Sequence, residues 1–311
     1  THLFYDYISS YEKGKELSHL PTQQEVSRQY PNPCGYGTGM EDCAILTGTM
    51  LGTLVDRYEQ TGDEQMKNFA SLLLEGLKRC SLIPGFSGFV ARGVCTEDGK
   101  SFYYNSSRDQ YTHCVHGVWK YYNSSLSNDS GRKIARSILT DIADRMHKNV
   151  IAENNFDFLQ ADGKPCPLGI CRMWNVQPHE AARLPMFYAA AWNVTQKKEY
   201  YDLYRSYINE AIDQSEKIGN NYSAYVYLQM MYSFELLSEL ETDSLLQKRL
   251  QKLIKRVGQL ALERSLDCLK EIQKIDKAEL SMLGPDWRSV KEWHTQNGYK
   301  IPRWGKYRNI W

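Results

Sequence analysis

The stretch CAILTGTMLGTLV, from Cys43 to Val55, contains no charged residue, and no other feature limits the possible folds as strongly. A helix without charge is buried on nearly all sides, so this one needs neighbours around it. The polar turn QTGDEQ follows, and then the amphipathic segment EQMKNFASLLLEGLKRC. The pattern therefore predicts a helical hairpin whose leading helix is enclosed by the rest of the protein.

Short motifs in the leading helix predict where it begins and how it packs. Thr38 and Glu41 have the spacing of a capping box, in which Thr and a Glu three residues later satisfy backbone N–H groups. We therefore expect the helix to begin there and to end near Glu59. Gly48 and Gly52 lie one turn apart, which allows a neighbouring helix to approach closely.

The hairpin pattern recurs along the chain. The predicted helix pairs are 109–124 with 132–147, 179–192 with 200–217, and 222–240 with 245–269. In the first and third hairpins the leading helix is the less charged member, as expected if leading helices lie inside. The second and fourth hairpins fit this rule less cleanly. No clear domain boundary interrupts the series, so we predict a single all-α domain over residues 1–311.

Two long connections separate the hairpins, at residues 85–107 and 156–175. Each contains an Asp-Gly dipeptide, which is typical of hairpin turns, at Asp98 and at Asp162. We expect a β-hairpin insertion in each connection, just before the next leading helix, so that both lie at one rim. Loops longer than about 12–15 residues in a compact domain are usually functional or disordered. The aromatic content of these loops favours an ordered, functional role.

Charge and aromatic content narrow the classes of partner. The 38 basic and 37 acidic residues leave a net charge of +1, whereas a nucleic-acid binder usually carries a basic patch. No apolar run approaches the roughly 20 residues that span a bilayer. The 22 tyrosines and 7 tryptophans suit a surface that is apolar and hydrogen-bonding at once, as a sugar ring demands, although most should pack between helices. We expect no cofactor, and the oligomeric state stays open.

The cysteines give limited information. The chain has 8 cysteines and no C-x-x-C pair, so a zinc ribbon is not expected. Cys166 and Cys171 are close enough in a loop to bridge. Cys43 and Cys114 lie inside helical patterns and are expected to be buried thiols.

Targeting signals are equally sparse. The segment THLFYDYISS has no basic stretch followed by an apolar one, so we expect that any targeting segment has been removed or never existed. Sequons occur at Asn105 and Asn193, where chance accounts for most such matches. A secreted or periplasmic location is therefore permitted, and a cytoplasmic one is not excluded.

The hairpins, the TGD-type turns and the predicted insertions resemble the six-hairpin, or (α/α)6-toroid, glycosidase superfamily. Within it the chain is most similar to the unsaturated glucuronyl and rhamnogalacturonyl hydrolases. The resemblance covers roughly residues 35–270 and includes GTGMEDCAILTGTMLGTLVDRYEQTGD and SSRDQYTHCVHGVWKYY. It implies an (α/α)6-like toroid, incomplete if only four hairpins form, and an enzyme that degrades polysaccharide or oligosaccharide fragments.

In that superfamily the catalytic acids lie near the N-terminal ends of inner helices, which Asp109 in SSRDQ and Asp42 in GMEDC match. The resemblance implies that Asp109 is the general acid/base and that Asp42 assists, as a base or by orienting substrate. Asp109 also fits a plain helix cap, and the helix dipole lowers the pKa of such a carboxyl although a general acid needs a raised one. Adjacent Arg108 either binds a substrate carboxylate or holds Asp109 ionised.

Asp109 begins a polar stripe that continues through His113, His116 and Lys120, at offsets of four, three and four. The histidines are either structural or available to bind hydroxyls and transfer protons, as in a sugar isomerase. Cys114 points about 100° away from His113 on a helix, so we expect no metal site.

His179 and Glu180 head the third predicted leading helix, after Pro178, and His179 occupies the position equivalent to Asp109. Either side chain is a candidate for the substrate cleft. The other candidate clamps and platforms are Arg92, Tyr104, Trp174, Trp293 and Trp304.

The sequence therefore favours a glycoside hydrolase that acts on a glycan or an unsaturated uronide oligosaccharide by carboxylate acid/base catalysis. A non-catalytic glycan-binding protein on the same fold, and a sugar epimerase or isomerase that uses cleft histidines, are the alternatives.

Overall fold

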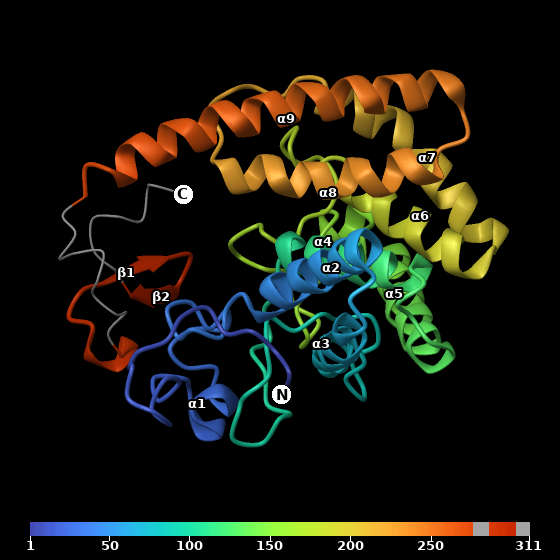
Figure 1. Ribbon diagram of the computed structural model, residues 1–311. Coiled ribbons are helices and arrows are strands. Elements are labelled where there is room, and N and C mark those ends of the chain that lie inside the picture. Colours follow the sequence, from blue (N-terminus) through green and yellow to red (C-terminus); the bar gives the residue numbers. More distant parts are fainter. Residues whose placement is uncertain (276–285, 303–311) are drawn as a thin grey trace.

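The computed structural model describes residues 1–275 and 286–302, and most of its regular structure is helical (Figure 1). The helices are α1 (Gln23–Ser27), α2 (Cys43–Thr61), α3 (Gln65–Ser81), α4 (Arg108–Asn123), α5 (Asp129–Asn149), α6 (Arg183–Thr195), α7 (Lys198–Ser215), α8 (Ala224–Leu240) and α9 (Ser244–Ile272). Short 3-10 helices span Ala152–Asn154 and Trp287–Ser289. The strands β1 (Trp293–Gln296) and β2 (Tyr299–Pro302) pair antiparallel. The predicted all-α class is confirmed.

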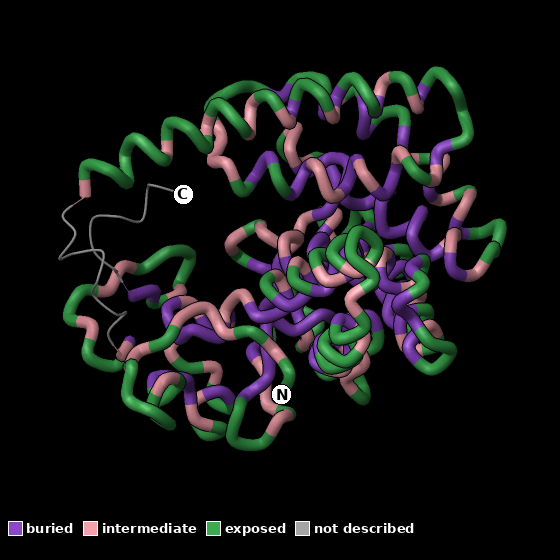
Figure 2. The backbone as a smooth tube through the Cα atoms, viewed as in Figure 1, coloured by how far each residue is buried: buried purple, intermediate pink, exposed green. Residues whose placement is uncertain are grey.

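The long helices pack in chain order as hairpins: α2 with α3, α4 with α5, α6 with α7, and α8 with α9. These are the four predicted pairs, with ends that mostly agree to within a few residues. Helix α4 also contacts α2, α6 and α8, and α6 contacts α8, so the leading helices pack on one another. Figure 2 shows buried residues concentrated where these helices meet, whereas the part of α9 that extends toward the β1–β2 hairpin is exposed.

The close approach of α2 to α4 depends on two glycines. A Cβ atom on Gly48 would lie 2.4 Å from the backbone oxygen of His113, and one on Gly117 would lie 2.2 Å from the oxygen of Gly48. Neither position can carry a side chain without moving a helix, because real Cβ contacts do not come this close. The prediction from Gly48 is therefore confirmed, whereas a Cβ on Gly52 would meet His116 at an ordinary 3.7 Å.

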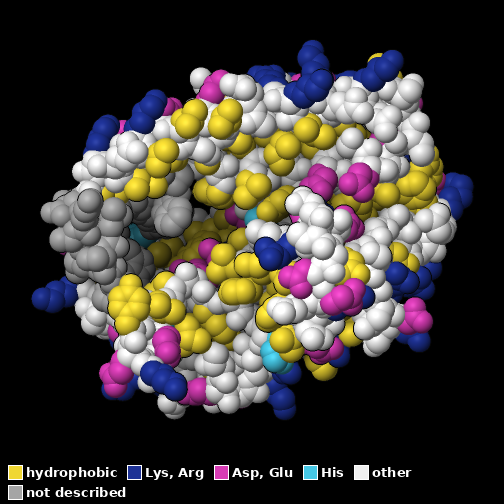
Figure 3. Space-filling model, viewed as in Figure 1, with side chains coloured by type: hydrophobic (Ala, Val, Ile, Leu, Met, Phe, Trp, Pro, Cys, Tyr) yellow, Lys and Arg dark blue, Asp and Glu magenta, His cyan; other side chains and the backbone are white. Residues whose placement is uncertain are grey.

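Helix α2 is less enclosed than its uncharged sequence predicts. Leu46 and Met50 each keep 37% of their surface exposed, so the expectation of burial on nearly all sides is wrong. The face turned away from α3 and α4 is the exposed one, because those two helices are its main partners. Figure 3 shows a hollow on this side of the molecule, with apolar side chains in it and along its upper edge.

The predicted capping box is also wrong. Helix α2 begins at Cys43, and the Glu41 carboxylate instead accepts hydrogen bonds from the N–H groups of Gly37 and Gly39, both at 2.8 Å. Those glycines have φ angles of 88° and 81°, which keep the chain in a turn where a helix was expected. The Thr38 hydroxyl donates to the backbone oxygen of Gly35 at 2.7 Å, so it does not cap the helix.

The β-hairpin insertions are not present either. Loops 82–107 and 150–182 are described in full, and neither contains a β-strand. Their turns form where expected, but no ladder develops. Loop 150–182 keeps one isolated antiparallel bridge, between Asp157 and Arg172, and in loop 82–107 a side chain takes up backbone donors. The Asp98 carboxylate accepts from the N–H groups of Lys100 and Ser101, both at 2.9 Å. Backbone donors satisfied in this way have no need of a partner strand.

Candidate functional site

Asp42 lies at the N-cap position of α2, and the structure shows no capping hydrogen bond from its side chain within the described residues. Its carboxylate accepts a hydrogen bond from the side-chain amide of Gln110 at 2.8 Å and lies 3.5 Å from the Arg92 guanidinium. The side chain keeps 46% exposure. It therefore faces the surface, held by groups from α4 and from loop 82–107.

Asp109 lies in the first turn of α4 and forms an ion pair with Arg183, the first residue of α6. The Arg183 side chain is almost fully buried, and its other terminal nitrogen donates to the side-chain oxygen of Gln229 on α8 at 2.8 Å. Asp109 itself keeps 34% exposure. Three hairpins thus position this one carboxylate.

The two carboxylates influence each other, and their pKa values move in opposite directions. Partial burial raises the pKa of Asp42, and the negative charge of Asp109 raises it further against the opposing charge of Arg92. Burial alone would raise the pKa of Asp109 as well, but Arg183 outweighs burial and lowers it to about 2. Asp109 is therefore ionised at neutral pH, and Asp42 holds a proton more readily than an ordinary aspartate.

Two more acids surround Asp42. The Asp6 carboxylate accepts the Asp42 backbone N–H at 3.1 Å, and burial together with Glu41 and Asp42 raises the pKa of Asp6. Burial and the charge of Asp42 raise the pKa of Glu41 to about 7. Like charges this close cannot all ionise easily, so protons are retained around Asp42.

Tyr225, in the first turn of α8, belongs to the same electrostatic region. Burial raises the pKa of its hydroxyl, and the charges of Asp109 and Asp42 raise it further. Its ring nevertheless keeps 51% exposure. An exposed ring within the electrostatic reach of two carboxylates is the kind of platform on which a sugar can stack.

The remainder of the polar stripe on α4 is satisfied within the protein. His113 hydrogen-bonds to the Thr49 hydroxyl at 2.7 Å, and burial lowers its pKa to about 3. His116 contacts the Glu235 carboxylate at 2.9 Å. Lys120 pairs with Glu235 at 3.0 Å and also with Asp56. The stripe is thus a buried seam between α2, α4 and α8.

Arg108 is occupied as well. Its guanidinium pairs with Glu180 and donates to the backbone oxygens of Gly169 and Arg172 at 2.8 and 2.7 Å. It is therefore not free to clamp a substrate carboxylate, and it acts on Asp109 only by helping to lower the pKa of that carboxyl.

The prediction that His179 heads a helix at the position equivalent to Asp109 is wrong. Helix α6 begins at Arg183, so His179 and Glu180 lie in the turn that precedes it. The Nε2 atom of His179 lies 3.5 Å from the Glu180 carboxylate, and its ring packs on Tyr222 with centroids 4.6 Å apart. Pro178 predicted a helix start at His179. The helix instead begins at Arg183, whose side chain is held by Asp109 and Gln229.

Two other predicted clamps or platforms, Arg92 and Trp174, are buried and make contacts inside the protein. Arg92 is buried, donates to the Glu41 backbone oxygen at 3.0 Å and stacks on the ring of Tyr36 at 4.8 Å. Trp174 is buried against Tyr207.

The remaining aromatic candidates lie in irregular segments or at the C-terminal end. Tyr104 contacts the ring of Phe102. The indole N–H of Trp293 donates to the Val290 backbone oxygen at 2.9 Å. Trp304 lies outside the described residues.

Sequence reasoning missed Arg183, Gln229, Gln110 and Tyr225. Arg183 and Gln229 carried a usable signal, because each interrupts an apolar run of a leading helix, residues 181–192 and 224–232. A polar side chain in such a helix must find a buried partner, so it marks a polar site between helices.

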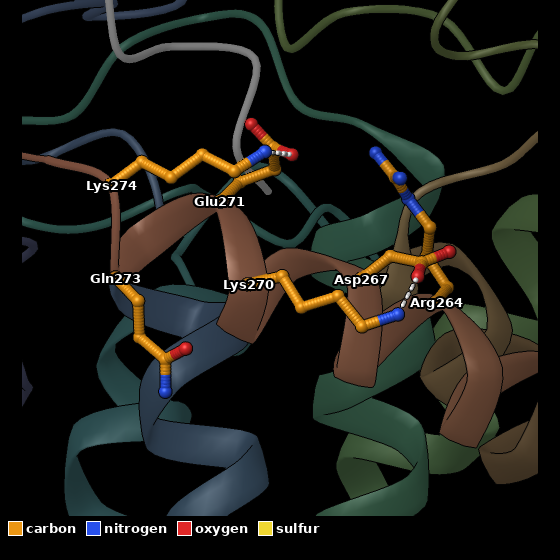
Figure 4. Close-up of a pocket in the computed structure, with 6 residues that line it drawn as sticks. All are labelled: Arg264, Asp267, Lys270, Glu271, Gln273 and Lys274. Atoms are coloured by element: carbon orange, nitrogen blue, oxygen red, sulfur yellow. Dashed lines mark hydrogen bonds and ion pairs between the residues drawn. The ribbon is translucent and has the colours of Figure 1, made fainter.

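Two open pockets in the described part of the chain lie away from these carboxylates. A cavity of about 650 Å³ along α9 is lined by Arg264, Asp267, Lys270, Glu271, Gln273 and Lys274 (Figure 4). Lys270 pairs with Asp267, and Lys274 with Glu271, along the same helix. Pairs of neighbours on one helix are typical of a solvated helix face. A second cavity, of about 440 Å³, lies between α5 and the loop after α3.

No protein-family model matches the chain, and no curated protein matches it. Within residues 1–275 and 286–302, no group of three or more His, Cys, Asp or Glu side chains is placed to hold a metal ion. Among the same residues, no helix combines the length and the apolar character needed to cross a bilayer.

Proposed function

We propose that the protein is a carbohydrate-active hydrolase of the six-hairpin type. Its helical hairpins would form an (α/α)6-like toroid with hairpins missing, and its substrate would be a glycan or an unsaturated uronide oligosaccharide. The order of the hairpins and the packing of their leading helices support this architecture. The positions of Asp42 and Asp109, at the starts of two adjacent leading helices, support the activity.

One arrangement carries the proposal: Asp42 is bonded to Gln110 and lies near Arg92, whereas Asp109 is paired with Arg183. These surroundings displace the pKa values of the two acids in opposite directions. Pairs of acids whose pKa values are pushed apart are the arrangement that divides acid and base work between two carboxyl groups.

Because Arg183 keeps Asp109 ionised, Asp109 is the base that activates water. Asp42 is the proton donor. The neighbouring acids Asp6 and Glu41, whose pKa values are raised, supply it with protons.

These assignments reverse the roles that the sequence favoured. The family resemblance made Asp109 the general acid/base and Asp42 its assistant. The Arg183 guanidinium lies against Asp109, however, and a carboxyl whose pKa is about 2 is a poor proton donor near neutral pH. The exposed ring of Tyr225 supplies an apolar surface beside both acids, which suits the CH face of a sugar.

A matched set of variants tests the proposal. Wild type, Asp42→Asn and Asp109→Asn are assayed on unsaturated uronide disaccharides and aryl glycosides, with Asp129→Asn as the control because that side chain is 96% exposed on α5. We expect losses of about 10²- to 10⁴-fold in kcat for both site variants and none for the control. Circular dichroism checks that each variant is folded.

The pH profile separates the roles of the two acids. Asp42 as the proton donor predicts that activity falls as pH rises past the raised pKa of Asp42. Turnover by wild type that survives both substitutions would refute the site. Binding of these oligosaccharides without any turnover would instead support the non-catalytic glycan-binding alternative. The isomerase alternative, which would use His113, His116 or His179, has less support. His113 and His116 are buried and hydrogen-bonded, and His179 packs on Tyr222 beside Glu180.

A further inference from the structure

The loop before α6 brings two thiols together beneath the surface. Cys166 and Cys171 are both buried, and their side chains hydrogen-bond to each other. The side-chain amide of Asn105 donates to the Cys166 sulfur at 2.8 Å. The Cys171 thiol lies 3.3 Å from the backbone oxygen of Ser106, to which it donates. Neither sulfur is part of the proposed carboxylate site, and both are present as thiols.

The surroundings of Cys166 favour its reactive form. The neighbouring Cys171 side chain lowers the pKa of Cys166 to about 6, assisted by Asn105 and opposed by burial. A thiol with such a pKa is largely thiolate at neutral pH, and the thiolate is the nucleophile in disulfide exchange. Pro165 and Pro167, on either side of Cys166, are exposed, whereas Cys166 itself is buried.

The same loop is attached to the start of α4. Between the two cysteines and just after them, the backbone oxygens of Gly169, Ile170 and Arg172 accept hydrogen bonds from Arg108, at 2.8, 3.0 and 2.7 Å. Asn105 and Ser106, which contact the sulfurs, lie just before Arg108 in the chain. A change at the sulfurs therefore acts on the residues just before α4 and on the loop to which Arg108 is bonded.

We propose that Cys166 and Cys171 form a reversible dithiol–disulfide pair whose state controls the segment that begins α4. In the first step the Cys166 thiolate attacks one sulfur of a small-molecule disulfide, forming a mixed disulfide and releasing one thiol. Cys171 then loses its proton and attacks the Cys166 sulfur, which closes the protein disulfide and releases the second thiol. Two protein thiols and one disulfide thus yield one protein disulfide and two small thiols.

Closing the bond changes the local hydrogen bonding. Cys171 no longer carries a proton to donate to the Ser106 backbone oxygen, and Cys166 is no longer a thiolate that accepts strongly from Asn105. At the same time the bond closes the loop covalently around Gly169 and Ile170, which reduces its conformational freedom.

The experiment equilibrates the full-length chain with glutathione and its disulfide at increasing ratios. The reaction is quenched in acid, free thiols are alkylated after unfolding, and peptides are mapped by mass spectrometry. We expect oxidation to remove two alkylation sites and to yield one Cys166–Cys171 linked peptide. Cys268→Ser, on α9, is the control that should keep this link. Cys166→Ala should lose it, and the mapping of the wild type remains decisive if that variant does not fold.

Hydrogen–deuterium exchange of the oxidised and reduced forms measures the second part of the proposal. Peptides that cover residues 168–173 should exchange more slowly in the oxidised form, because the bond closes that loop. Peptides that cover residues 105–109, which lose hydrogen bonds to the sulfurs, should exchange faster, while peptides from α9 should be unchanged. Two results overturn the proposal: both thiols remain free under fully oxidising conditions or pair with Cys34, or the link forms without any change in exchange at these segments.

Discussion

Replacing Asp109 with asparagine tests the charge arrangement through stability alone. The folded pKa of Asp109 is about 2 because of Arg183, whereas an aspartate in an unfolded chain has a pKa of about 3.9. That difference corresponds to about 2.5 kcal/mol of stability at neutral pH. Because the side chain keeps 34% exposure, solvent screens the pair. We therefore expect Asp109→Asn to lower the free energy of unfolding by about 1–2 kcal/mol.

The sign of the pH dependence follows from the lowered pKa. Ionised Asp109 stabilises the folded state fully above the unfolded pKa of about 3.9, and this stabilisation is lost as pH falls through the folded pKa. The variant has no titrating group at this position. The difference in unfolding free energy between wild type and Asp109→Asn should therefore stay constant down to about pH 5 and shrink below about pH 4.

Urea unfolding followed by tryptophan fluorescence, repeated at several pH values, measures this difference. Asp129→Asn, at the exposed start of α5, serves as the control and should differ from wild type by less than about 0.5 kcal/mol. A difference for Asp109→Asn that stays flat through the acid range would refute the reasoning. It would mean that Asp109 is not the charged partner of Arg183 in the folded protein.

Two further substitutions test the packing and the polar seam. Gly48→Ala should destabilise the protein by about 1–3 kcal/mol in urea unfolding, because its Cβ would collide with the α4 backbone; Gly258→Ala, on α9 with open space around it, should not. Glu235→Gln should cost about 1 kcal/mol at neutral pH, because it weakens the bonds to His116 and Lys120. An unchanged melting temperature for Glu235→Gln would contradict the role of the seam.

The helical hairpins could be predicted from sequence because their signal is local. An apolar stretch such as Cys43–Val55 and its partner segment lie within one hairpin, so periodicity and turn residues suffice. The start of α2 could not be predicted in the same way. Glu41 is three residues after Thr38, as a capping box requires, but the left-handed conformations of Gly37 and Gly39 turn the chain and use Glu41 differently.

The candidate site was predictable only in part, because the residues that contact Asp42 and Asp109 come from distant segments of the chain. Asp42 and Asp109 stood out as acids at helix starts. Whether each is charged depends on Arg92 and Arg183, which are far away in sequence and reach the carboxylates only through the packing of loop 82–107 and of α6. No local pattern encodes the contact between Arg183 and Asp109. The sequence therefore could not assign the proposed acid and base roles to the two carboxyl groups.

The polar stripe of α4 explains why the proposed chemistry depends on the first turn of this helix. Asp109 keeps 34% exposure, whereas the side chain of His116 keeps 4% and that of Lys120 13%. Groups below the first turn are held by partners on α2 and α8, and the low pKa of His113 keeps it neutral at physiological pH. In the proposed reaction the proton donor would therefore come from outside α4. Asp42, half exposed and within the field of Asp109, meets that requirement.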